Sequence, residues 1–148
     1  MTVTGGSSEV SGDPLDTSDR ASLTDRQVAE RFIEAFHRQC RMREAFMAWV
    51  HPDYIQHNPE APAGRDETLE VLDQIQGIYP RMSHDVKRVI HGDDGLVAIH
   101  HNWRAEPEDL GAAVVDILRI KDGWVVEHWD VIQHIPDPST WKNNNTMF

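Results

Sequence analysis

The second half of the chain alternates apolar and polar residues over four stretches, and this alternation is typical of half-buried β-strands. The stretches cover about residues 83–91, 95–104, 112–120 and 124–134. The last two flank the loop Lys121-Asp122-Gly123, and an Asp-Gly pair between β-branched runs is a strong local signal for a β-hairpin. The pattern therefore predicts four consecutive antiparallel strands.

The first half of the chain has apolar residues at helical spacing instead. Thr24 and Gln27 have the spacing of a capping box. The apolar stripe that follows them contains Val28, Phe32, Ala35 and Phe36. Two more helices are predicted over about residues 41–50 and 69–79, with a short extended segment at 54–59 between them. Helices followed by consecutive strands predict an α+β fold, in which the helices cover one face of an antiparallel sheet.

The composition is that of one globular domain, with 148 residues of which 39% are hydrophobic and 26% charged. Residues 1–22 are rich in Gly, Ser, Thr and Asp, which predicts a disordered tail before a domain at 23–148. The net charge of -11 argues against nucleic acid as a partner, and no apolar run is long enough for a membrane span. A single cysteine and the lack of a secretory pattern favour a cytoplasmic location.

Strand alternation sorts the candidate site residues by sheet face. On residues 95–104, the bulkier and more apolar face is predicted to point into the core. That face carries Val97, Ile99, His101 and Trp103. On residues 112–120, both faces are apolar enough to be covered, so parity alone does not decide where Asp116 points. A buried carboxyl group is costly unless it is paired or used, which makes Asp116 the leading candidate for chemistry.

The length of the hairpin loop decides what lies opposite Asp116. A three-residue loop, with glycine in the left-handed position, sets Asp116 opposite His128 and puts Asp130 on the same face. A two-residue loop sets Asp116 opposite Trp129 and puts Glu127 on that face. We prefer the three-residue loop, and the other register stays open at this point.

Several segments, taken in order, resemble the SnoaL-like branch of the nuclear transport factor 2-like superfamily. They are the helices ahead of a curved sheet, the runs at 54–59, 115–119 and 127–133, and the closing run at 143–148. The resemblance covers about residues 24–148. It implies a cone-shaped α+β barrel, with N-terminal helices packed on a curved antiparallel sheet around a deep apolar pocket, and often a dimer.

The resemblance also implies roles for individual residues. In the polyketide cyclases of this family, a buried Asp is the general base of an intramolecular aldol closure, with a His nearby. By strand position, Asp116 resembles that Asp and His101 resembles that His. Ketosteroid isomerases share the fold and place their base ahead of the third helix, where this sequence has His57. The implied protein is a cofactor-independent cyclase, lyase or isomerase acting on a small apolar carbonyl compound. A non-catalytic module that binds a small ligand is the alternative.

The residue types agree with a pocket of this kind. An apolar pocket would raise the pKa of Asp116 toward neutrality and suit it to take a proton next to a carbonyl group. Tyr54 could donate a hydrogen bond to an oxyanion, and His57 could act as a base. The other expected ligand-binding residues are Trp103, His128, Trp129 and Asp130.

We expect no metal and no cofactor, because no short His-x-His or His-x-x-x-His pattern is firmly combined with a carboxylate, and the neighbours His100 and His101 point to opposite faces of a strand. The outer face of the sheet predicts a homodimer, since three helices are too few to cover both faces. In the preferred register that apolar outer face contains Val115, Ile117, Trp129 and Val131.

Overall fold

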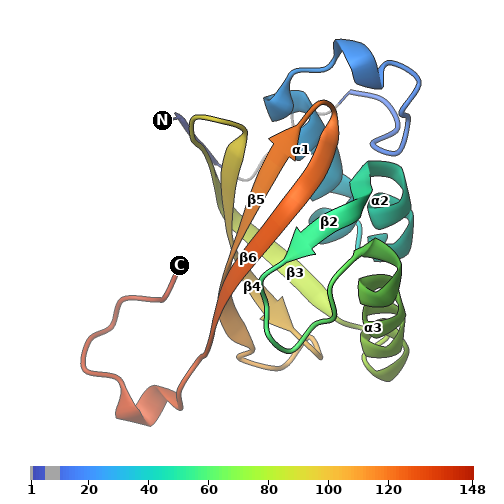
Figure 1. Ribbon diagram of the computed structural model, residues 1–148. Helices are drawn as coiled ribbons and strands as arrows, with labels where there is room; N and C mark the ends of the chain where they lie inside the picture. Colours follow the sequence, from blue (N-terminus) through green and yellow to red (C-terminus); the bar gives the residue numbers. More distant parts are fainter. Residues whose placement is uncertain (1, 6–10) are drawn as a thin grey trace.

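The computed structural model describes residues 2–5 and 11–148, and over these residues three α-helices pack on a curled, six-stranded sheet (Figure 1). The helices are α1 (Asp25–Ile33), α2 (Met42–Trp49) and α3 (Arg65–Ile78). A short π-helix, Glu34–Arg38, continues α1 without a break. The predicted α+β class is thereby confirmed, with helices gathered on one side of the sheet.

The predicted capping box starts α1. Thr24 Oγ1 accepts a hydrogen bond from the backbone N–H of Gln27 at 3.2 Å, and Gln27 Oε1 accepts one from the Thr24 N–H at 2.9 Å. Two N–H groups that the helix itself cannot satisfy are thus paired. The helix turns Val28 and Phe32 onto the sheet, where both are buried.

The four predicted strands are present and pair antiparallel in chain order. They are β3 (Ser83–His91), β4 (Leu96–Arg104), β5 (Ala112–Lys121) and β6 (Trp124–His134). Strand β1 (Thr2–Gly5) pairs antiparallel with β3, and β2 (Val50–Gln56) pairs with β6. The full order is β1-β3-β4-β5-β6-β2.

Strand β2 departs from the prediction of a purely antiparallel sheet. It runs parallel to β6, and it begins directly where α2 ends. The sequence suggested only a short extended segment at 54–59, since Pro52 looks like a break between elements. Proline is tolerated here because β2 lies at the edge of the sheet, where one side of the strand needs no N–H partner.

The sheet curls around a core but does not close into a barrel. Within the described residues, β1 and β2 are its two edges and do not pair with each other. The core cluster joins α1 and α2 to the concave face of the sheet through residues such as Ile33, Trp49, Ile99 and Leu118. In the part of the chain that the structure describes, no helix combines the length and the apolar character needed to cross a membrane.

Residues 11–22 have defined contacts with the domain, although we expected residues 1–22 to form a disordered tail. Trp49 Nε1 donates a hydrogen bond to the Pro14 carbonyl at 2.8 Å, and Leu15 packs against the core cluster. The Arg20 guanidinium stacks on the Trp124 indole, 3.5 Å from the ring centroid. Residues 1 and 6–10 lie outside the described part of the chain.

The β5–β6 hairpin corrects both registers considered above. Its loop has two residues, Asp122 and Gly123, and both have positive φ, as a type I′ turn requires. A bulge then places Val126 between two paired positions, and beyond it Asp116 lies opposite Asp130. The bulge restores the parity of the preferred register, so Asp116 and Asp130 share the concave face although the loop length was wrong.

Candidate active site

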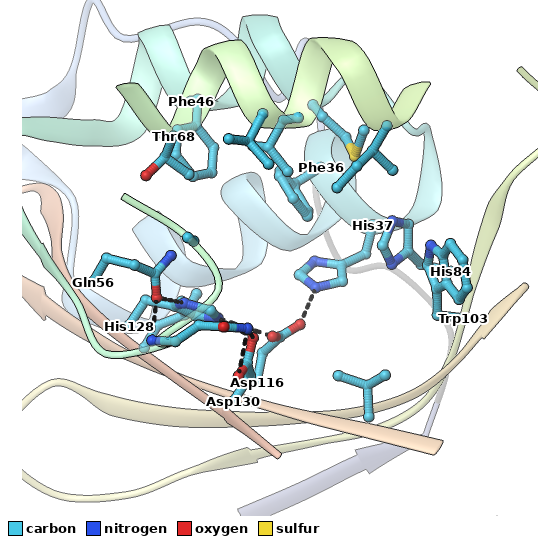
Figure 2. A pocket seen from close by; sticks show the side chains of 18 of the residues that line it. Phe36, His37, Phe46, Gln56, Thr68, His84, Trp103, Asp116, His128 and Asp130 are labelled. Carbon is cyan, nitrogen blue, oxygen red and sulfur yellow. Dashed lines mark hydrogen bonds and ion pairs between the residues drawn. The ribbon is translucent and has the colours of Figure 1, made fainter. Parts of the chain in front are cut away.

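A deep, mostly apolar cavity of about 570 Å³ lies between the helices and the concave face of the sheet (Figure 2). Its size is within the range of sites for small molecules. Aromatic and aliphatic residues make most of its wall, among them Phe32, Phe36, Phe46, Leu72, Ile75, Val114 and Leu118. Among the polar side chains of the wall, a hydrogen-bonded group surrounds one carboxylate.

That carboxylate is Asp116, whose side chain is 14% exposed on the cavity wall. Its Oδ2 accepts hydrogen bonds from His37 Nε2 at 3.0 Å and from His101 Nε2 at 2.8 Å. Its Oδ1 accepts one from His128 Nε2 at 2.9 Å. An ionised carboxylate offers about four acceptor positions, so three imidazoles leave about one of them, on Oδ1, for a substrate.

Sheet register brings two of these imidazoles to Asp116. Asp116 pairs with Ile99 on β4, and His101 stands two positions along that strand. On the other side Asp116 pairs with Asp130 on β6, and His128 stands two positions along. Diagonal neighbours on the same face are within reach of long side chains. The prediction that His101 points into the core is thus confirmed, and the open question of the Asp116 face is settled.

The hydrogen bonds change the expected charge of Asp116. Burial alone would raise its pKa, as we expected from an apolar pocket, but the hydrogen bonds from His101, His128 and His37 outweigh burial and hold the pKa well below its usual range. Asp116 is therefore an anion at neutral pH, and each Nε2 that bonds to it carries a hydrogen. The expectation of a pKa near neutrality is wrong, because it counted the apolar walls and not the imidazoles.

His128 is the hydrogen-bond partner of Asp116 that can act as a proton donor, because its pKa is raised. Burial lowers its pKa, but the hydrogen bond and the charge of Asp116, together with the charge of Asp130, raise it overall above the ordinary value. Its Nδ1 lies 2.7 Å from Gln56 Oε1, and Asp130 Oδ2 lies 4.0 Å from Nε2. Asn58 Nδ2 in turn donates to both oxygens of Asp130, at 3.0 and 2.8 Å. Acceptors on both ring nitrogens favour the imidazolium form.

Two cavity histidines escaped the sequence analysis. His37 comes from the π-helix, whose wider turn places residues five apart above one another and so brings His37 under Phe32. His84 lies on β3 directly opposite Trp103, and this pairing could have placed it in the pocket once Trp103 was assigned there. Burial lowers the pKa of both imidazoles, so they are neutral in the folded protein.

The remaining predicted residues divide into two groups. Tyr54 and Trp103 line the cavity, and the Tyr54 hydroxyl donates to Thr68 Oγ1 at 3.0 Å. His57 and Trp129 are absent from the described cavity wall. Their rings stack on each other with centroids 4.8 Å apart, and His57 Nε2 lies 2.9 Å from Glu127 Oε1. Both belong to the outer side of the sheet, because Trp129 has the opposite parity to Asp130 and His128.

These features agree with what comparison with known proteins shows. The model of the SnoaL-like domain matches residues 29–128, and the chain belongs to this family. No curated protein matches it. The membership predicted from the sequence is thereby confirmed.

Three solved structures illustrate the shared fold. Bal32a from a soil-derived mobile gene cassette is 18% identical with a TM-score of 0.61, over 76% of this chain and 91% of that one. IdmH from Streptomyces antibioticus, a proposed polyketide cyclase, is 22% identical with a TM-score of 0.56, over 74% and 92%. A proposed polyketide cyclase from Bacillus cereus is 18% identical with a TM-score of 0.60, over 75% and 79%. At such identities the likeness shows the fold alone.

Proposed function

We propose that this protein is a SnoaL-like cyclase, lyase or isomerase that acts on a small apolar carbonyl compound by general acid–base catalysis. The observation that carries the proposal is the buried Asp116 carboxylate, held by three imidazoles on the wall of a mostly apolar cavity. A buried carboxylate with a strongly shifted pKa on a cavity wall is a candidate for a functional role, because such groups concentrate at functional sites. The proton transfers need only side chains of this chain.

Asp116 and His128 have opposite tasks in this scheme. Asp116 takes a proton from a carbon next to a carbonyl group, and the electron pair left behind forms an enolate. The enolate carbon attacks a second carbonyl group of the same molecule, which forms a carbon–carbon bond and leaves an alkoxide. His128 gives its proton to that oxygen, and the proton on Asp116 restores the imidazolium through their 2.9 Å contact. Two groups with pKa values shifted apart are what acid–base catalysis requires.

The hydrogen bonds around Asp116 narrow the substrate class. Three N–H donors already stabilise the anion, so the carboxylate is a weak base. A weak base removes only an acidic proton at a useful rate. We therefore infer a substrate whose reacting carbon lies between two carbonyl groups, with an apolar remainder that fills the aromatic part of the cavity. Polyketide-like molecules have this character, and two of the structural neighbours are proposed polyketide cyclases.

Hydrogen–deuterium exchange tests the proton-abstraction step without knowledge of the natural substrate. The protein is incubated in D2O with a panel of apolar 1,3-dicarbonyl compounds, and deuterium at the central carbon is followed by NMR. We expect at least one compound to exchange about 100-fold faster than in buffer, which is typical of a positioned general base. The rate should fall to the buffer value in Asp116→Asn.

Glu127→Gln is the matched control. Glu127 is a carboxylate that also bonds to a histidine, His57, but it lies on the outer side of the sheet. Exchange should be unchanged in this variant. Binding of panel compounds to the wild-type protein without any accelerated exchange would refute the enzyme and support the non-catalytic binding module. Equal exchange by wild type and Asp116→Asn would remove Asp116 from the mechanism.

A further inference from the structure

Three histidines from different parts of the chain meet in the cavity. His37 comes from the π-helix, His84 from β3 and His101 from β4. Their ring centroids lie 5.3, 5.0 and 5.0 Å apart, so the rings form a nearly equilateral triangle. One ring nitrogen of each lies within 4.8 Å of the corresponding nitrogens of the other two.

His84 is the member of the triangle that lacks an explanation. Both its ring nitrogens are buried, and neither has a hydrogen-bond partner among the described residues. A buried polar group without a partner costs about 1–3 kcal/mol. His37 and His101 each bond to Asp116 through Nε2, but their Nδ1 atoms are likewise buried and unpartnered among these residues. Each of the three rings therefore has a free lone pair.

We propose that His37, His84 and His101 bind one divalent transition-metal ion, with zinc as the expected type. Neutral imidazole is a ligand that zinc prefers, and three histidines are a known set for ions with an open coordination position. Zinc–nitrogen bonds of about 2.0–2.1 Å place tetrahedral ligands roughly 3.3 Å apart, so nitrogens that lie within 4.8 Å of one another need to close by at most about 1.5 Å. Asp116 adds a negative charge beside the ion and orients two of the rings.

A second group of side chains in the cavity has similar spacing, namely Asp116, His128 and Asp130. It is the weaker candidate, because its members already satisfy one another. Asp116 accepts from His128, and Asp130 accepts from Asn58 through both oxygens. A metal there would have to displace these bonds, whereas the triangle around His84 offers nitrogens without partners. The prediction of no metal rested on the lack of a short His-x-His or His-x-x-x-His pattern with a carboxylate, and residues 37, 84 and 101 are too far apart in sequence to form one.

An ion at this place would complement the acid–base pair. The three histidines line the same cavity as Asp116, so a carbonyl oxygen of a bound molecule could occupy the open coordination position. Coordination would polarise that carbonyl group and make the neighbouring C–H more acidic, which offsets the weakness of Asp116 as a base. This catalytic consequence rests on the proposed function, but binding of the ion does not depend on it.

Metal binding to the full chain, freed of any affinity tag and stripped with a chelator, tests the proposal without a substrate. Isothermal titration with Zn²⁺ should give one site per chain. Titration with Co²⁺ should give the visible absorption of a low-symmetry, nitrogen-ligated ion. In His84→Phe, which keeps a ring but removes the nitrogens, the affinity should fall by more than about 100-fold. His100→Gln is the control, because His100 neighbours a ligand but is absent from the described cavity wall.

A single zinc site in the wild-type protein that persists in His84→Phe would overturn the proposal, since the ion would then lie elsewhere. Absence of any micromolar site in the wild-type protein would overturn it as well, and this result does not depend on how the variants fold. His101→Asn serves as a second ligand variant if His84→Phe is unfolded, and it should lose the site in the same way. Deuterium exchange that proceeds in the metal-free protein would leave the proposed function intact.

Discussion

Replacement of Asp116 by asparagine perturbs the centre of the cavity with almost no change of shape. The carboxylate accepts three hydrogen bonds from His37, His101 and His128, and a neutral amide cannot replace all of them. One end of the amide is a donor, and the imidazoles that face it must change tautomer or lose their partner. We therefore expect Asp116→Asn to destabilise the folded protein, although it removes a buried charge.

The size of this effect follows from opposing contributions. Three hydrogen bonds to an ionised group contribute roughly 1.5–3 kcal/mol each, and the desolvation of a buried carboxylate cancels several kcal/mol of that sum. The pKa of Asp116 lies well below its usual value, and each unit of such a shift corresponds to about 1.4 kcal/mol in favour of the anion. The net loss in the variant should thus be roughly 1–3 kcal/mol, or a fall in Tm of roughly 3–10 °C for a chain of this length.

Denaturation by urea and by heat, followed by circular dichroism in the presence of a chelator, measures this difference. A carboxylate with a depressed pKa stabilises the fold above the unfolded value of about 3.9 and loses that contribution as pH falls through the lower folded value. The difference between wild type and Asp116→Asn should therefore be full at pH 6 and shrink below about pH 4. Glu127→Gln, on the outer side of the sheet, should cost less than about 1 kcal/mol.

An Asp116→Asn variant that is as stable as the wild type, or more stable, would refute this account of the site. The three imidazoles would then contribute nothing net to the folded state, and the depressed pKa of Asp116 would lose its basis. A difference that stays unchanged as pH falls from 4 toward the depressed pKa of Asp116 would also contradict it, because the protonated carboxyl group present below that pKa should be nearly equivalent to asparagine.

Three further predictions concern the scaffold. Gly111→Ala should lower the free energy of unfolding by more than about 2 kcal/mol in thermal denaturation, because Gly111 has φ of 76° and an added Cβ would lie 2.0 Å from the Trp103 carbonyl oxygen. Gly77→Ala is the contrasting variant in α3, where an added Cβ meets nothing within 4 Å. It should raise the free energy of unfolding by about 0.5–1 kcal/mol. Thr24→Ala should cost about 1 kcal/mol in the same assay, by loss of the capping box. Sedimentation velocity should show a homodimer formed through the outer sheet face, where Val131 is 66% exposed. Val131→Glu should shift the protein to a monomer, and a monomeric wild type at micromolar concentration would contradict the predicted dimer.

Much of the fold could be predicted because its elements are specified by local patterns. The capping box at Thr24 and the strand alternation after residue 83 depend on neighbouring residues only. The β5–β6 hairpin shows the limit of prediction from local patterns. An Asp-Gly pair identifies the turn, but the bulge at Val126 has no local signature, and it decides which residue lies opposite Asp116. The parallel edge strand β2 is also invisible locally, since its partner β6 lies more than sixty residues away.

The candidate site could be predicted as far as strand parity reaches. Parity placed His101 and Trp103 on the cavity side, and the cost of burying a carboxyl group made Asp116 the leading candidate. His57, which the resemblance suggested as a base, follows β2 and is absent from the described cavity wall, and no local pattern indicated His37. A regular α-helix would turn residue 37 away from Phe32, and only the π-helix brings it back toward the cavity. The pKa of Asp116 was misjudged because the prediction counted the apolar walls and not the hydrogen bonds from His101, His128 and His37.

The Arg20 guanidinium has a consequence for how this domain can be shortened. It lies over Trp124 and 5.0 Å from the Trp49 ring centroid, and it donates hydrogen bonds to the carbonyls of Gly123 and Ala48. One side chain ahead of α1 thereby links the tip of the last hairpin to the end of α2. A protein that begins at residue 23 would keep α1–α3 and the strands β2–β6, yet lose this link. Its hairpin tip would be the first place open to a protease.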